Sequence, residues 1–298
     1  MNMLGFCRHK SLPLIEGYGR SLNATPRFAC NVERHQWASK RHCSKPKSRM
    51  TVNSSIQNRP VLVLVSLMTA SLAALLLMPP LVQDQSYHQF ADQRALLGIP
   101  NFWNVVSNLP FVAVGAVGLW QFHRHAATIV LFLGICLTGF GSSYFHWDPS
   151  DATLFWDRLP MTICFAAILA VVIEERVDMR AGSLMLWPLL AIGVSSVLLW
   201  SWTGDLRLYA WAQFFPFLAL VLILQLFKPR YSGAFYWIIA IVFYALAKLF
   251  EHFDDEIFSV GSVVSGHTLK HFAAAAGSFA ILVLFQKRQL IGGAVRSD

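Results

Sequence analysis

Long apolar segments separated by short polar ones run from about residue 61 to residue 286. Each apolar segment is close to the roughly 20 residues that a helix needs to cross the hydrocarbon core of a bilayer. A backbone in that environment must satisfy its own hydrogen bonds, and the weak two-residue alternation argues against a β-barrel, so we expect helices. The eight expected spans are residues 61–82, 102–122, 126–146, 153–173, 182–202, 208–227, 235–251 and 263–286. The pattern predicts an all-α, polytopic membrane helical bundle.

The composition agrees with a membrane protein and argues against nucleic acid as a partner. Hydrophobic residues make up 55% of the 298 residues and charged residues only 13%, whereas an ordinary soluble domain has about 25% charged residues. The net charge of +8 arises in residues 1–60, which hold 11 of the 24 Lys and Arg residues but 2 of the 16 Asp and Glu residues. The remaining chain has a balance of −1. We therefore expect no basic surface for nucleic acid.

The charge pattern also divides the chain into segments. Residues 1–60 form a basic, Ser- and Arg-rich tail that is poor in acids. Such a composition is typical of a disordered arm or a transit segment, while Met50 leaves open an over-extended start. We expect one transmembrane helix over 61–83, a larger helical domain over 84–287 and a C-terminal tail over 288–298.

Lys and Arg residues near the span ends predict the orientation, because cytoplasmic loops accumulate them. With eight spans, 19 of these residues fall on one side of the membrane, whereas only Arg94 and Arg207 fall on the other. Both termini are therefore expected in the cytoplasm. The opposite side collects acidic residues, which carry less weight as a topology signal. They are Asp84, Asp92, Asp148, Asp151, Asp254, Asp255 and Glu256.

Three histidines inside or at the ends of spans are candidate metal ligands. Ionisable groups within spans are costly and usually face the bundle interior, which makes them functional candidates. His267 and His271 are four residues apart, so both lie on one helical face and can share a metal ion. His146 is expected at the same membrane depth, near the non-cytoplasmic face. Three His ligands leave the fourth zinc position open, as in catalytic sites. The competing interpretation is that each histidine caps a helix or bonds a neighbouring one.

Two further polar residues are expected near these histidines. Ser142 lies four residues before His146 and on the same helical face. Asp157 follows about one turn into the next span. Its carboxylate is a candidate general base or a partner that orients a histidine ligand. Alternatively it forms an ion pair with Lys270, or less favourably with Arg158, because adjacent helix residues point apart.

A polar stripe marks the second span. Asn101, Asn104, Ser107 and Asn108 follow helical spacing. Such stripes more often join helices than bind substrate. We assign Asn104, Ser107 and Asn108 mainly to packing around the site, with a subsidiary place in the wall of a substrate cavity.

The combination of these residues resembles a known family. Ser142-x3-His146-x10-Asp157, followed far downstream by His267-x3-His271, is similar to the alkaline ceramidases. These belong to a wider group of seven-helix membrane hydrolases that includes the adiponectin receptors. The resemblance covers roughly residues 85–287 and implies a seven-helix hydrolase core. The span over 61–82 is then one extra N-terminal transmembrane helix.

The resemblance implies a zinc-dependent intramembrane amidase. Such an enzyme hydrolyses the N-acyl bond of a ceramide-like membrane lipid to a sphingoid base and a free fatty acid. By the same resemblance, His146, His267 and His271 are the Zn²⁺ ligands. Asp157 is the catalytic carboxylate, and Ser142 is the hydroxyl that stabilises the oxyanion.

The resemblance does not extend to the Ca²⁺ site of the eukaryotic ceramidases. One of their acidic ligands immediately precedes the Phe-Trp-Asn motif, where this chain has Asn101. The segment from Tyr87 to Asp92 does not reproduce their acidic cluster either. Calcium dependence is therefore not implied.

Other functions remain open at this point. One is a lipid-responsive seven-helix receptor with a structural zinc, and another is a hydrolase of a different N-acyl or ester lipid. A transporter would predict charges at the bilayer centre and internal repeats, and the chain has neither. No obligate protein partner is indicated.

Overall fold

The computed structural model describes residues 54–291. The chain divides into two units, residues 1–50 and 51–298, and all described residues belong to the second. Most of the predicted N-terminal tail and the end of the C-terminal tail, residues 292–298, therefore lie outside the described residues.

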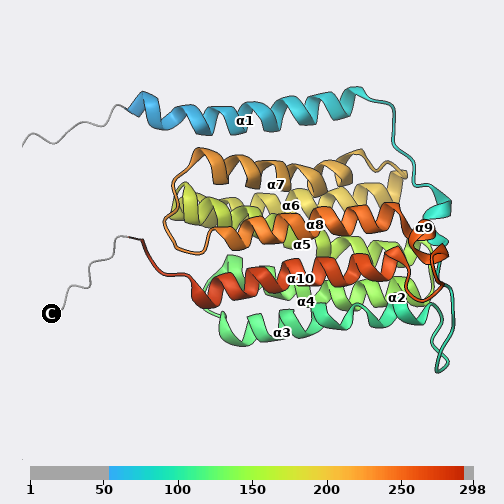
Figure 1. Cartoon of the computed structure of the whole chain (residues 1–298). Helices are drawn as coiled ribbons and strands as arrows, with labels where there is room; N and C mark the ends of the chain where they lie inside the picture. Colours follow the sequence, from blue (N-terminus) through green and yellow to red (C-terminus); the bar gives the residue numbers. More distant parts are fainter. Residues whose placement is uncertain (1–53, 292–298) are drawn as a thin grey trace, which may run out of the picture. The chain divides into compact units, whose positions relative to one another are not determined.

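The eight predicted spans are confirmed as helices that are long and apolar enough to cross a membrane, within the part of the chain that the structure describes. Each lies within a few residues of its predicted bounds, apart from the earlier start of the first (Figure 1). They are α1 (Ser54–Leu77), α2 (Phe102–Val106) with α3 (Leu109–Gln121), α4 (Ala126–Trp147), α5 (Asp151–Arg176), α6 (Met179–Thr203), α7 (Arg207–Leu226), α8 (Phe235–His252) and α10 (Gly266–Lys287).

The second span differs from its prediction because it is divided in two. Pro110 stands in the first turn of α3 and has no N–H to donate to the preceding turn. The helical hydrogen-bond ladder is therefore interrupted at Ser107 and Asn108, which connect α2 to α3. Both side chains are fully buried at this break. The interruption places polar groups, rather than a continuous apolar surface, against the neighbouring helices.

Helix α5 lies at the centre of the bundle and packs against α4, α6 and α7. Helix α10 packs against α8 and α3, and α3 also packs against α4. Helix α1 lies at one edge, beside α7 (Figure 1). There the Trp211 indole donates to the Ser71 hydroxyl at 3.0 Å. The extra helix is thus attached to the outside of the seven-span arrangement.

Two glycines allow close helix contacts near the polar end of the bundle. A Cβ atom on Gly141 of α4 would lie 2.0 Å from the Trp156 carbonyl oxygen of α5. A Cβ atom on Gly266 of α10 would lie 2.2 Å from the Phe250 carbonyl oxygen of α8. Only glycine permits these approaches. They bring Ser142 toward Asp157 and the start of α10 toward the end of α8.

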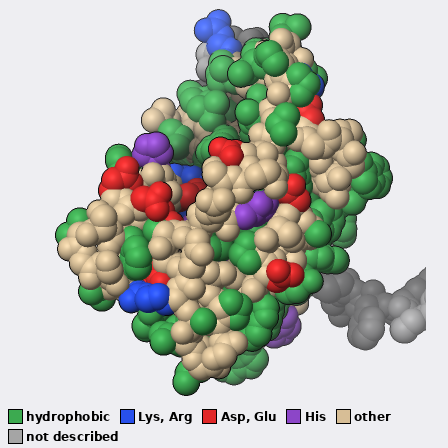
Figure 2. Space-filling view, turned by 90° about the vertical axis from the view of Figure 1, so that its right-hand side faces the viewer, with side chains coloured by type: hydrophobic (Ala, Val, Ile, Leu, Met, Phe, Trp, Pro, Cys, Tyr) green, Lys and Arg blue, Asp and Glu red, His purple; other side chains and the backbone are tan. Residues whose placement is uncertain are grey.

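The ends of these helices share one face of the described unit with two short elements. The 3₁₀ helix η1 (Gln85–His88) precedes α2, and α9 (Asp254–Ser259) precedes α10. Figure 2 shows acidic and histidine side chains distributed over this face. The polar residues predicted inside the spans lie just below it, because they occupy the adjoining ends of α4, α5, α8 and α10.

Candidate metal centre and active-site cavity

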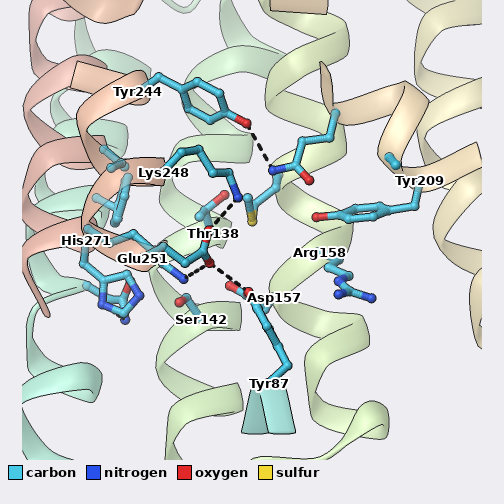
Figure 3. Close-up of a pocket in the computed structure, with 18 of the residues that line it drawn as sticks. Tyr87, Thr138, Ser142, Asp157, Arg158, Tyr209, Tyr244, Lys248, Glu251 and His271 are labelled. Atoms are coloured by element: carbon cyan, nitrogen blue, oxygen red, sulfur yellow. Dashed lines mark hydrogen bonds and ion pairs between the residues drawn. The ribbon is translucent and has the colours of Figure 1, made fainter. Parts of the chain in front are cut away.

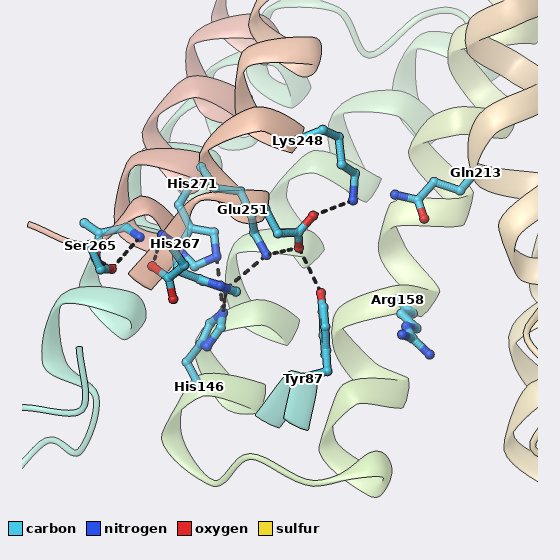
Figure 4. A network of polar contacts seen from close by, with 12 residues as sticks. Tyr87, His146, Arg158, Gln213, Lys248, Glu251, Ser265, His267 and His271 are labelled. Carbon is cyan, nitrogen blue, oxygen red and sulfur yellow. Dashed lines mark hydrogen bonds and ion pairs between the residues drawn. The ribbon is translucent and has the colours of Figure 1, made fainter. Parts of the chain in front are cut away.

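Three buried histidines converge in the bundle. His146 comes from the last turn of α4, while His267 and His271 come from the first turns of α10. The Nε2 atom of His146 lies 3.2 Å from Nε2 of His271 and 3.3 Å from Nε2 of His267 (Figure 4). All three side chains are at most 4% exposed. The histidines from two distant segments are therefore arranged so that they could hold one metal ion.

The spacing of the ring nitrogens fits a tetrahedral ion. A Zn–N bond of about 2.0–2.1 Å implies an edge of about 3.3 Å between two nitrogen ligands of a regular tetrahedron. The two Nε2–Nε2 distances from His146, 3.2 and 3.3 Å, match that edge. The three imidazoles are buried with ligand nitrogens close together, so one cation could bind all three.

His271 is held by the polar break between α2 and α3. Ser107 Oγ donates to the Asn104 carbonyl at 3.3 Å, and the same oxygen lies 2.8 Å from His271 Nδ1. Since the hydroxyl proton is directed at the carbonyl, the oxygen is free to accept from an Nδ1–H group. That arrangement favours the His271 tautomer whose Nε2 carries a lone pair toward the other histidines.

The start of α10 is fixed by its own cap and by neighbouring segments. Ser265 is the N-cap and accepts from the Thr268 backbone N–H. The Thr268 hydroxyl donates to Asn104 Oδ1 at 2.9 Å. Asp254 accepts from the His267 N–H at 2.6 Å and from the Ala91 N–H at 3.1 Å. These bonds set the rotation of α10 and hence the direction of both of its histidines.

A cavity of about 250 Å³ lies beside the histidines. Ser142 and Asp157 line it together with His271 (Figure 3). Asn108 also lines it, whereas Asn104 and Ser107 lie behind its wall, fully buried. A second, apolar cavity of about 110 Å³ shares part of this wall. The shared lining residues are Phe111, Thr138, Met161, Tyr244 and Ala274.

A buried ion cluster forms another wall of the cavity. Glu251 accepts from Lys248 at 2.7 Å, from Lys270 at 2.8 Å and from the Tyr87 hydroxyl at 3.0 Å (Figure 4). Burial, followed by the Glu251 carboxylate, raises the pKa of the Tyr87 phenol well above its usual value. The phenol therefore stays protonated and acts as a donor. Glu251 therefore both pairs with Lys248 and lines the cavity.

Lys270 connects this ion cluster to the histidines. Its Nζ atom lies 3.0 Å from His267 Nε2 and 2.8 Å from Glu251 Oε1. A metal ion on His267 requires Lys270 to leave that nitrogen, and Glu251 is positioned to retain the ammonium group. Asp157 forms no ion pair with Lys270 or Arg158 within residues 54–291.

Some lining residues carried no sequence signal. Tyr87 and Gln83 come from the segment before α2, which has no helical period or motif to mark it. Tyr87 lines the cavity, and Gln83 Oε1 accepts from Arg158 at 2.5 Å. Lys270 was expected near the site as a partner of Asp157, but its contacts in the structure are with Glu251 and His267.

Comparison with known proteins identifies the family of the chain. The family profile described as Ceramidase matches residues 97–291, which include the three candidate metal-binding histidines, Ser142 and Asp157. A search of curated proteins gives no match. The matched region spans more than half of the chain and runs from just before α2 to the residues after α10. The chain belongs to the ceramidase family and is a multi-pass membrane hydrolase that acts on the amide bond of ceramide.

Proposed function

We propose that this protein is a zinc-dependent intramembrane amidase that converts ceramide-like lipids to a sphingoid base and a free fatty acid. The observation that carries the proposal is the placement of His271, Ser142 and Asp157 on one cavity next to two further buried histidines. His146, His267 and His271 would hold the Zn²⁺ ion. When bound there, zinc supplies Lewis-acid activation of the amide carbonyl and of water.

Asp157 serves as the general base and general acid in this proposal. Its side chain is 6% exposed and faces the cavity rather than a basic partner. It takes a proton from the attacking water and returns it to the nitrogen of the leaving sphingoid base. Ser142 donates a hydrogen bond to the amide oxygen as negative charge develops there.

The apolar cavity supports a substrate with long hydrocarbon chains. It adjoins the polar cavity and is lined by side chains from α3, α4, α5, α7, α8 and α10, among them Phe165, Phe217 and Trp237. An acyl chain placed there leaves the amide bond at the polar end, beside Asp157. A water-soluble peptide would leave this apolar surface unused.

Fatty-acid release by the purified full chain in lipid nanodiscs tests the function. We expect hydrolysis of ceramide, loss of activity after treatment with a zinc chelator, and recovery on addition of Zn²⁺. His271→Ala should lose both bound zinc and activity, whereas Asp157→Asn should retain zinc but lose activity. Full hydrolysis by metal-free His271→Ala would contradict the proposal. A zinc-loaded chain that hydrolyses none of the N-acyl or ester lipids would favour a receptor.

We further propose that both termini lie in the cytoplasm and that the site opens near the opposite face. The proposal rests on the distribution of Lys and Arg along the sequence. Protease cleavage of tags at either terminus in sealed vesicles tests it. Protection of both tags in right-side-out vesicles, and cleavage in inverted ones, is the expected result.

A further inference from the structure

Arg158 is a buried cation in the wall of the cavity. It lies in the second turn of α5, is 6% exposed and lines the cavity with Asp157 and Tyr209 (Figure 3). Its guanidinium carbon lies 4.2 Å from the Trp200 ring centroid and 4.7 Å from that of Tyr209. The aromatic rings fix the plane of the guanidinium group.

The hydrogen bonds of this guanidinium group are incomplete. One terminal nitrogen, Nη2, donates to Gln83 Oε1 at 2.5 Å. The other, Nη1, is buried and has no hydrogen-bond partner within residues 54–291. In the same range, no carboxylate lies within ion-pair distance of Arg158. A charged side chain inside a span normally has such a partner, because burial of a lone charge is costly.

The charges around the cavity leave Arg158 without compensation. The ionisable residues of the wall, apart from His271 and the tyrosines, comprise three cations and two anions. Glu251 is already shared by Lys248 and Lys270. Asp157 precedes Arg158 directly, and adjacent helix residues point in different directions. The cavity therefore has a net positive charge, and Arg158 is the one of its three cations that forms no ion pair within residues 54–291; a metal ion at the histidines would add to this charge.

Arg158 lies at the end of the cavity where the head group of a lipid substrate would be placed. Figure 3 shows His271 and Arg158 on opposite sides of the cavity, with Asp157 between them. Suppose that a lipid substrate has its amide bond beside Asp157 and its acyl chain in the apolar cavity. Its head group then lies on the side of Arg158. Guanidinium groups bind carboxylates and phosphates through paired N–H donors.

We propose that Arg158 binds an anionic head group of the lipid substrate through Nη1, so that the enzyme prefers acidic N-acyl lipids to neutral ceramide. The segment that follows α1 contributes Gln83, which orients the guanidinium group. The inference rests on the proposed function for the site of cleavage, but the binding of an anion at Arg158 can be measured without turnover.

The experiment compares three lipids with identical chains, using the full chain in nanodiscs. The probes are N-oleoyl-sphingosine, its 1-phosphate and its zwitterionic 1-phosphocholine. Binding is measured by displacement of a fluorescent acyl lipid, and hydrolysis by fatty-acid release. We expect the 1-phosphate to bind about tenfold or more tightly than N-oleoyl-sphingosine, the change expected for one charge-assisted hydrogen bond. The 1-phosphocholine lipid keeps one anionic phosphate oxygen beside a cationic amine and should bind between the two.

Variants of Arg158 test whether this residue causes the preference for the 1-phosphate lipid. Arg158→Gln should reduce it to about twofold or less, through KM rather than kcat, and Arg158→Lys should retain part of it. The matched control is Arg176→Gln. Arg176 lies at the other end of α5, donates to the Phe227 carbonyl at 3.0 Å and does not line the cavity. That variant should keep the wild-type preference. Size-exclusion profiles identify folded variants, and Arg158→Lys replaces Arg158→Gln if the latter does not fold.

Several results overturn the inference. One is equal binding of the three lipids by the wild-type chain, and another is a preference that survives Arg158→Gln. Free oleate serves as a further competitor: if its binding falls as much as that of the 1-phosphate in Arg158→Gln, the residue holds the released acid instead of a head group. If the chain hydrolyses no lipid but binds the 1-phosphate through Arg158, the proposed function fails and the anion-binding site at Arg158 stands.

Discussion

The hydrogen bond between Ser107 and His271 allows a quantitative test of the metal centre. Ser107 Oγ lies 2.8 Å from His271 Nδ1, and both side chains are at most 3% exposed. Ser107→Ala removes the oxygen that accepts from Nδ1–H, so the ring loses the group that fixes its tautomer and rotation. The Asn108 amide nitrogen is 3.5 Å from the same ring nitrogen and is itself a donor, so it cannot accept that proton.

The expected effect follows from the loss of one buried partner. An unsatisfied buried donor costs about 1–3 kcal/mol of folding free energy. Loss of a hydrogen-bond partner behind a metal-binding histidine typically lowers metal affinity by about 10- to 100-fold. Zinc Kd values measured by competition with a chromophoric chelator should therefore rise by one to two orders of magnitude in Ser107→Ala. Hydrolysis should recover when zinc is supplied in excess.

Ser143→Ala is the matched control. The Ser143 hydroxyl donates to the Val105 carbonyl at 3.1 Å and contacts none of the three histidines through a hydrogen bond. Ser143→Ala also deletes one side-chain hydrogen bond, between α4 and α2. Its effect on zinc affinity therefore shows what the loss of such a bond causes away from the histidines. If Ser107→Ala binds zinc as tightly as Ser143→Ala, the assignment of Ser107 to the metal centre is wrong.

Three other perturbations are expected to separate packing, charge and pH effects. Gly141→Ala places a methyl group against the backbone of α5. It should therefore lower the midpoint temperature of thermal unfolding and reduce activity even at saturating zinc. Wild-type values of both quantities would contradict the close contact. Glu251→Gln leaves Lys270 without its carboxylate, and zinc affinity should fall about 10- to 100-fold if that ammonium group then competes for the histidine nitrogen. Although burial opposes ionisation, hydrogen bonds from Arg94 keep the pKa of Asp92 below its usual value. Their contribution to stability is therefore present above about pH 4 and is lost as the pH falls further. Arg94→Ala should lower the free energy of unfolding at pH 7 and leave it less dependent on acid pH; an acid-unfolding profile unchanged by that substitution would refute the assignment.

The sequence alone contained the spans and the local pairs of the site. Apolar length determines which segments can cross a membrane, and helical periodicity places His267 and His271 on one face whatever surrounds them. The short connections between spans also require the end of α4 and the start of α10 to reach the same face of the bundle. These are properties of chain length and local geometry, so no tertiary information was needed to predict them.

The break in the second span was only partly accessible to this reasoning. Pro110 is visible in the sequence, but a proline in the first turn of a new helix and one inside a kinked helix give similar hydropathy patterns. The role of Ser107 depends on this distinction. Its hydroxyl reaches His271 because the polypeptide turns from α2 to α3 at that point and α10 packs beside it.

Only the tertiary structure decided how the charged groups share the cavity. Hydropathy reports the cost of burying Lys248, Glu251, Lys270 and Arg158 but not which of them satisfy one another. Their pairing depends on the rotation of α5, α8 and α10 about their axes, which is set by close contacts such as that of Gly266 and by the Ser265 cap. Three of the four form one ion cluster, and Arg158 lies outside it with a buried N–H group directed at no partner in residues 54–291. The physical reason is that side-chain pairing requires positions within a few ångströms, which local sequence patterns do not specify between distant helices.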